Sequence, residues 1–278
     1  MHKLRLQNAK LIDRCNKLID VTIATKNNGR TIGNCLQAIR ANIPFRSIIV
    51  IDGQSTDNTL QIARSLGAKI FIDTGLLGKI RYAQAEHCET QWIAYVDSDV
   101  YVYPSWWAEV SKFTGVPDVG MISALGHSPI DRLPIYEDYL SYMARKYGNV
   151  AFSNTLVRRD LVLSCRELLS NIHAGEDSIL ARHITNLDMR IITIPEQLVF
   201  HDKNTFHEHP GAFLRWGCSA RILGGIAGIR NVAKTLRNNL RNWWIFTSET
   251  RQLSFSLLLY LIFLWGCTLK GYLIRQSK

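Results

Sequence analysis

The chain has 278 residues, of which 47% are hydrophobic and 20% are charged, and its formal net charge is +10. This composition excludes a disordered or collagen-like chain, and the length allows one large domain with an appendage or two smaller domains. The six cysteines form no CxxC pair, which excludes zinc-finger spacing and favours a reduced, cytosolic environment. The N-terminal residues lack the apolar stretch that is typical of a secretory signal.

The first hundred residues alternate between two hydrophobic patterns. Short apolar runs rich in β-branched residues predict strands, and segments with apolar residues at helical spacing follow them. The predicted strands are Leu18–Thr25, Ser47–Asp52, Lys69–Asp73 and Trp92–Asp97, and the predicted helices are Thr31–Ala41, Asp57–Leu66 and Lys79–Cys88. This order predicts an α/β, Rossmann-like fold with a mostly parallel sheet and helices on both faces.

The pattern continues with less regularity up to residue 205, where we place the end of the first domain (1–205). Strands are predicted at Gly120–Leu125 and Val150–Val157, helices at Asp160–Ser170 and Glu176–Thr185, and a last pair of strands at Arg190–Ile194 and Gln197–His201, separated by Pro195.

Residues 206–278 predict a basic helical tail. From residue 203 onward there are eleven Lys or Arg and two acids, a charge of +9, whereas residues 1–202 carry about +1. Asn231–Arg241 predicts a basic helix, and the uncharged run Gln252–Leu269 lies at the lower length limit for crossing a bilayer. We therefore expect a membrane segment at about 252–274, an anionic membrane surface as partner rather than nucleic acid, and a cytoplasmic first domain. A helical cap packed on the first domain is the alternative.

Acidic residues follow several predicted strands and open one predicted helix. Ligands of parallel sheets bind beyond the carboxyl ends of the strands. Asp97 and Asp99 are either a strand-end turn or a pair that shares a divalent cation, Mn²⁺ or Mg²⁺. Glu176 and Asp177 either stabilise the start of a helix or include a general base that takes a proton from a hydroxyl.

Basic and imidazole side chains add further candidates. Lys79 and Arg81 are either on a solvated helix face or close to a phosphate, which arginine can bind with two hydrogen bonds. His201 is either a structural histidine or a third metal ligand. His207 and His209 lie in a predicted loop and are weaker candidates for a metal site.

Five segments in a fixed order carry a family pattern: VTIATKNNGRTIGNCLQAI, IIVIDGQSTDNT, WIAYVDSDV, GEDSIL and LVFH. Over about Lys17–His201, this order resembles the family-2 glycosyltransferases, which have a GT-A fold. The resemblance implies inverting transfer of a sugar from a UDP- or GDP-sugar donor. It implies donor contacts at Thr25, Asn27, Asp52, Arg81 and Asp97, metal ligands at Asp97, Asp99 and His201, and a catalytic base at Asp177 in the Glu176–Asp177 pair.

The sequence departs from the family pattern at two positions. Asn28 stands where a glutamate is usual, which bears on the donor contacts. Polyprenyl-phosphate sugar synthases of this family often have glutamine where Tyr101 stands, which bears on the acceptor together with the base at Asp177 and the basic tail. We therefore expect the acceptor to be a hydroxyl of a lipid-linked saccharide or a cell-surface glycan precursor. A polyprenyl-phosphate sugar synthase and a non-catalytic membrane-surface protein remain alternatives. A nucleotidyltransferase would carry a denser Gly-rich phosphate loop than Gly29 and Gly33 provide.

Overall fold

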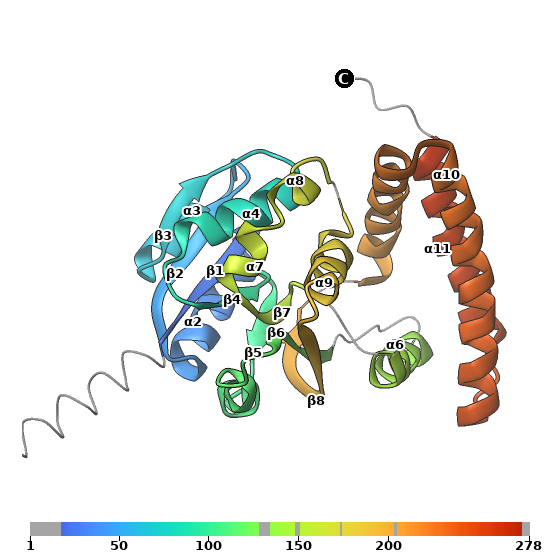
Figure 1. Ribbon diagram of the computed structural model, residues 1–278, viewed down its shortest axis with the longest axis horizontal. Helices are drawn as coiled ribbons and strands as arrows, with labels where there is room; N and C mark the ends of the chain where they lie inside the picture. Colours follow the sequence, from blue (N-terminus) through green and yellow to red (C-terminus); the bar gives the residue numbers. More distant parts are fainter. Residues whose placement is uncertain (1–17, 128–133, 148–150, 173, 203–204, 274–278) are drawn as a thin grey trace, which may run out of the picture.

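The computed structural model describes residues 18–127, 134–147, 151–172, 174–202 and 205–273, and Figure 1 shows an α/β body beside a helical tail. The body contains one eight-stranded sheet in the order β3-β2-β1-β4-β7-β6-β8-β5. Its strands are β1 Ile19–Thr25, β2 Phe45–Asp52, β3 Lys69–Ile72, β4 Trp92–Val96, β5 Val100–Val102, β6 Val119–His127, β7 Asn154–Arg158 and β8 Arg190–His201.

Helices connect most of these strands. Those of the body are α2 Ile32–Asn42, α3 Thr59–Ser65, α4 Leu77–His87, α5 Trp106–Val110, η1 Ser111–Phe113, α6 Pro134–Tyr147, α7 Arg159–Leu163, α8 Arg166–Leu169 and α9 Glu176–Asn186. The tail consists of α10 Thr205–Thr250 and α11 Phe255–Leu273.

The sheet has a parallel half and a mixed half. Strands β3, β2, β1 and β4 run parallel, and their register places Thr25 opposite Asp52. Strand β7 runs antiparallel to both of its neighbours, β4 and β6, while β6 and β8 are parallel. Two hydrophobic clusters cover the two faces, one including Ile32 and Leu36 of α2 and the other including Ala85 of α4 and Ile179 of α9. The predicted α/β sheet with helices on both faces is therefore confirmed.

Two local predictions for the body were wrong. The predicted pair of strands before residue 201 is one continuous strand, β8, whose register with β6 shifts between Ala124 and Leu125. Pro195 lies at this irregularity, where a missing backbone N–H leaves the ladder intact on either side. The single helix predicted at Asp160–Ser170 is two short helices, α7 and α8.

The tail is a helical hairpin in which α10 bends around α11. Gly217 packs closely against α11, because a Cβ at this position would lie 2.0 Å from the Thr268 carbonyl oxygen. Farther along α10, the carbonyl oxygen of Val232 accepts a hydrogen bond from Trp265 Nε1 at 2.8 Å. In a straight helix Gly217 and Val232 would stand about 22 Å apart, yet their partners on α11, Thr268 and Trp265, are only three residues apart. Helix α10 therefore bends between these two contacts. The predicted loop around His207 is wrong, because this residue lies within α10.

The predicted apolar segment is helix α11. It has 19 residues and is long and apolar enough to cross a membrane by length and composition, and one third of its most apolar window (33%) is buried. Helix α6 joins the tail to the body, because Tyr136 and Tyr139 share a buried cluster with Phe246 of α10 and Leu257 of α11.

Candidate active site

Asp97, Asp99 and His201 converge at the edge where β4 ends. Strand β5 pairs with β8 so that Val100 lies opposite His201, which brings the end of β8 beside the Asp97–Asp99 segment. One ligand atom from each of the three side chains lies within 4.8 Å of the others, and His201 Nε2 is 3.1 Å from Asp99 Oδ1. Two carboxylates and one imidazole, each partly exposed, fit a divalent cation that also needs room for phosphate oxygens.

Hydrogen bonds hold this acidic segment in place. Asn28 Nδ2 donates to Ser98 Oγ at 2.7 Å, and the backbone N–H of Asp202 donates to the Asp99 carbonyl at 2.7 Å. Arg30 and Tyr101 in turn donate to the carboxylate of Asp202, the tyrosine at 2.6 Å. This support was not predicted, and the position of Asp202 directly after His201 was its only signal in the sequence.

Arg81 connects the acidic segment to the start of α9. Arg81 is 4% exposed. Its Nη2 donates to Asp97 Oδ1 at 2.9 Å, and its Nε lies 3.6 Å from Glu176 Oε1. The Phe152 ring lies 5.0 Å from the guanidinium carbon. Burial opposes the charge, but Asp97 and Glu176 outweigh it and raise the pKa of Arg81, so this buried cation stays protonated.

Glu176 and Asp177 open α9 after Gly175, whose φ of +84° turns the chain into the helix. Burial raises the pKa of both carboxyls, and the charge of Arg81 partly opposes this effect. Glu176 is 6% exposed and paired with Arg81. Asp177 is less buried, and its Oδ1 accepts from the N–H of Ser178 at 2.6 Å. Asp177 is therefore the more accessible of the two carboxyl groups.

A cavity of about 610 Å³ lies at the carboxyl ends of β1, β2 and β3. Thr25, Gly53, Asp73 and Arg215 line it, so the tail contributes a cation to a cavity formed mainly by the body. Thr25 Oγ1 is buried and has no hydrogen-bond partner among the described residues. A hydroxyl of this kind can bond to a ligand that enters the cavity.

The other candidate donor contacts hold the neighbouring loops. Asn27, at a φ of 53°, accepts from the backbone N–H of Thr56 at 2.8 Å, which ties the loop after β1 to the loop after β2. Asp52 is fully buried and accepts from the N–H of Ser55 at 2.7 Å. Lys79 is exposed on α4, and its Nζ lies 3.5 Å from Oδ1 of Asp73, which lines the cavity.

Three comparisons with known proteins, by family model, by sequence and by structure, each find glycosyltransferases. Residues 20–155 match Glycosyl transferase family 2. A glycosyltransferase of Rickettsia typhi is 34% identical over 85 residues, which cover 30% of this chain and 28% of the relative. The 4,4'-diaponeurosporenoate glycosyltransferase of Staphylococcus aureus is 34% identical over 107 residues, which cover 36% of this chain and 28% of the relative. The chain thus spans little more than a quarter of the length of these curated relatives.

The fold has solved counterparts. A mannosyltransferase from Pyrobaculum calidifontis, in complex with GDP-Man and Mn²⁺, superposes with a TM-score of 0.64 at 16% identity. The superposition covers 91% of this chain and 86% of that one, which shows that the body has the GT-A fold. Residues 20–155 therefore form a glycosyl transferase family 2 segment within a body that has the GT-A fold.

Proposed function

We propose that this chain is an inverting glycosyltransferase that moves a sugar from a UDP- or GDP-sugar to a hydroxyl of a lipid-linked saccharide or a cell-surface glycan precursor. One observation carries the proposal. Asp97, Asp99 and His201 converge within 4.8 Å beside Arg81, and Arg81 bridges to the Glu176–Asp177 pair. This arrangement combines a cation site, a buried positive charge and a carboxyl with a raised pKa at one edge of the sheet.

The cavity at β1–β3 is the donor site in this proposal. Its position beyond the carboxyl ends of parallel strands is where such sheets bind nucleotides. Thr25 offers an unpaired hydroxyl, and Lys79 and Arg215 offer positive charge to the diphosphate. Asp52 and Asn27 accept hydrogen bonds from the loop after β2 and so hold that loop in place beside the cavity. The mannosyltransferase with bound GDP-Man has the same fold, which supports a nucleotide-sugar donor.

Asp97, Asp99 and His201 would hold the divalent cation, Mn²⁺ or Mg²⁺. Their oxygen-rich ligand set and mutual spacing fit such an ion, and the related fold contains Mn²⁺. When bound, the ion supplies positive charge to the diphosphate. Arg81 holds Asp97 through a charge-assisted hydrogen bond and so fixes one ligand in advance.

The chemical step would be one displacement at the anomeric carbon. The acceptor oxygen forms a bond to this carbon from the face opposite the diphosphate, and the bond from the carbon to the diphosphate oxygen breaks with its electron pair. Asp177 accepts the proton that the acceptor hydroxyl loses. The buried charge of Arg81 stabilises the negative charge that develops on the leaving group. A single displacement inverts the configuration at the carbon.

The tail would seat the enzyme on an anionic membrane. Arg230, Lys234, Arg237 and Arg241 recur at helical spacing on α10, are exposed, and lead to Trp244, which is 64% exposed. Each such charge near an anionic surface contributes about 1 kcal/mol. On α11, apolar side chains that include Leu259 and Phe263 are exposed at the same time. A surface with both properties fits lipid headgroups and acyl chains together.

The packing of the hairpin favours a seat within the interface over a membrane crossing. Trp243 Nε1 donates to the carbonyl of Ser254 at 2.9 Å and Trp265 Nε1 to that of Val232 at 2.8 Å, so the basic part of α10 runs alongside α11. If α11 crossed the bilayer, that part of α10 would enter the hydrocarbon with it. Each Lys or Arg at the centre would then cost about 2.5–3.5 kcal/mol.

The test is release of nucleoside diphosphate by the purified full chain in detergent. A panel of UDP- and GDP-sugars is incubated with Mn²⁺ or Mg²⁺ and membrane lipid extract, and the wild type is compared with Asp99→Asn and Asp177→Asn. Asp118→Asn is the matched control, because Asp118 is exposed and pairs with Arg190 at the other end of the sheet. Metal-dependent release from one donor, lost only in the first two variants, is expected. No release from any donor would instead favour a non-catalytic membrane-surface protein.

A further inference from the structure

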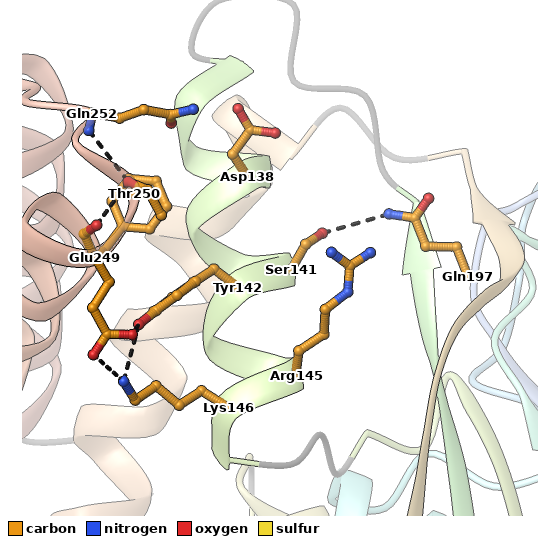
Figure 2. Close-up of a pocket in the computed structure, with 10 residues that line it drawn as sticks. Asp138, Ser141, Tyr142, Arg145, Lys146, Gln197, Glu249, Thr250 and Gln252 are labelled. Atoms are coloured by element: carbon orange, nitrogen blue, oxygen red, sulfur yellow. Dashed lines mark hydrogen bonds and ion pairs between the residues drawn. The ribbon is translucent and has the colours of Figure 1, made fainter.

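A second cavity, of about 720 Å³, lies apart from the donor cavity and the acidic cluster. It is formed where α6 meets β8 on one side and the junction of α10 with α11 on the other, and Figure 2 shows residues of all these segments around it. The proposed donor site does not account for this cavity, because the two cavities share no lining residue.

The charged side chains of this cavity balance each other. Lys146 and Glu249 form an ion pair, and the hydroxyl of Tyr142 also donates to Glu249. Asp138 and Arg145 form no hydrogen bond or ion pair with any residue in the described part of the chain. Figure 2 shows the guanidinium of Arg145 extending into the space between α6 and Gln197 of β8. The cavity thus offers one acceptor group and one donor group that lack a partner among the described residues, and its four charges cancel.

Neutral hydrogen-bonding groups complete the lining. Gln197 Nε2 and Ser141 Oγ are 3.5 Å apart, so each retains capacity for a closer partner. Phe246 and Tyr142 contribute aromatic surface. A phosphate would meet Asp138 and Glu249 as well as the two cations, whereas a ring with several hydroxyls matches separate donors and acceptors around an aromatic wall. The lining therefore fits a neutral saccharide better than an anion.

The position of the cavity relates it to both the catalytic centre and the tail. Gln197 and His201 are on the same strand, four residues or about 13 Å apart, a length that a di- or trisaccharide covers. On the other side, Gln252 lines the cavity, and Leu253 and Phe255, which follow it, are 61% and 65% exposed. A saccharide in the cavity can therefore extend towards the acidic cluster while an attached lipid lies along the exposed start of α11.

We propose that the cavity between α6, β8 and the α10–α11 junction binds a neutral saccharide unit of the acceptor, away from the hydroxyl that reacts. The proposal rests on the proposed glycosyltransferase function, because it assigns the substrate of that activity. Asp138 and Arg145 would form the hydrogen bonds that recognise the hydroxyl groups of the saccharide.

The experiment measures binding of free disaccharides to the full chain by saturation-transfer NMR in a detergent without a sugar headgroup. The probes are cellobiose, maltose, chitobiose and mannobiose, with inorganic phosphate as the rival probe. The variants are Asp138→Asn and Arg145→Gln. Asp118→Asn and Arg190→Gln are matched controls, because they remove the same charges from an exposed ion pair elsewhere on the sheet. Titration with UDP and GDP in the presence of Mn²⁺ reports separately on the donor site and on folding.

At least one disaccharide should bind the wild type and both controls, and its signal should fall at least about fivefold in each cavity variant while nucleotide binding stays unchanged. The proposal is wrong if no disaccharide binds the wild type, or if binding persists in both cavity variants. Binding of phosphate alone, lost in Arg145→Gln, would make the cavity an anion site and would also overturn it. If the wild type binds no nucleotide, the proposed function fails, whatever the disaccharides show.

Discussion

The body and the tail of this chain differ in how far their apolar side chains are exposed to solvent. Strand β4 is buried along its whole length, and helices cover both faces of the sheet. In the tail, Phe255, Leu259 and Phe263 are 65%, 66% and 53% exposed on a helix whose other side packs against α10. Exposed apolar surface of this extent is typical of an interaction site. The sheet of the body is covered by its own helices, whereas α11 presents an exposed apolar face that is available to a partner.

Charges show the same contrast. In the body, Arg30 pairs with Asp202, and Arg190 pairs with Asp118. In the tail, the exposed Lys234, Arg237 and Arg241 have no acidic partner within the described residues. In the proposed function the chemistry lies on the body, with Arg215 of the tail lining the donor cavity, and the attraction to an anionic surface lies on the tail. Substitutions in one region should leave the property of the other intact.

The largest effect is expected from Asp99→Asn. This change removes one of the two carboxylates of the Asp97–Asp99–His201 cluster, and therefore half of the negative charge that would hold the cation. Transfer should fall at least about 1,000-fold, equivalent to about 4 kcal/mol of transition-state stabilisation. Release of nucleoside diphosphate measures the loss. Sedimentation with anionic liposomes should be unchanged, and a parallel loss of both would mean that the two regions are not independent.

Asp177→Asn should reduce transfer by about 100- to 1,000-fold, because the base is lost while the donor site remains. The pH dependence identifies the group. A base acts in its deprotonated form, so activity falls as the pH drops through its pKa, and burial raises the pKa of Asp177. The acid limb of kcat/KM should therefore lie above the range of an exposed aspartate, whose pKa is near 3.9. A limb at or below that value would argue against Asp177 as the base.

Local sequence patterns predicted most of the body and one part of the tail. The βαβ alternation of the first hundred residues depends on apolar periodicity within each segment, and all four predicted strands exist. Strand β5 was missed because it has three residues and exists through its pairing with β8, a hundred positions away. The unbroken course of β8 and the bend of α10 likewise depend on partners that periodicity does not reveal.

The candidate site shows the same limit. Asp97, Asp99, His201, Arg81 and the Glu176–Asp177 pair were all named from the sequence, and the structure brings them together. The roles assigned to them stay predictions. The pairing of Arg81 with both Asp97 and Glu176 could not be predicted, since these residues come from three separate elements. Neither could the cavity beside α6, because its lining comes from α6, β8 and the junction of α10 with α11, which lie far apart in the sequence.

Replacing Leu259 and Phe263 with aspartate tests the apolar face of the tail. Both side chains are mostly exposed, so the fold should tolerate the change, but each new charge opposes burial in acyl chains by up to about 2.5–3.5 kcal/mol. Liposome sedimentation should weaken at least about 30-fold, while UDP or GDP binding stays at the wild-type value. Leu259→Ala with Phe263→Ala is the control and should lose much less. Undiminished liposome binding by the aspartate variant would rule out this face as the contact.

Gly271→Val tests whether the hairpin is one unit. A Cβ at this position would lie 2.0 Å from the Leu214 carbonyl oxygen, so α10 and α11 must separate. Overpacking of this kind costs about 1–3 kcal/mol. We expect easier proteolysis within residues 205–273 and an unchanged body in hydrogen exchange. Gly266→Val is the matched control, because nothing lies within 4 Å of its Cβ position. Equal sensitivity of both variants would contradict the close crossing.

The smallest effect per residue is expected from Arg237→Gln with Arg241→Gln. This change removes two of the four exposed basic residues of α10, which form a basic stripe of Arg230, Lys234, Arg237 and Arg241. Each charge contributes about 1 kcal/mol near an anionic surface, so binding to anionic liposomes should weaken by about fivefold per residue and become less dependent on salt. Binding to neutral liposomes should not change, because the apolar face of α11 is untouched. Arg190→Gln removes an exposed charge from the body and should leave both measurements at the wild-type value. If this control weakened binding as strongly, attraction would come from net charge rather than from the stripe, and the contrast between body and tail would not extend to electrostatics.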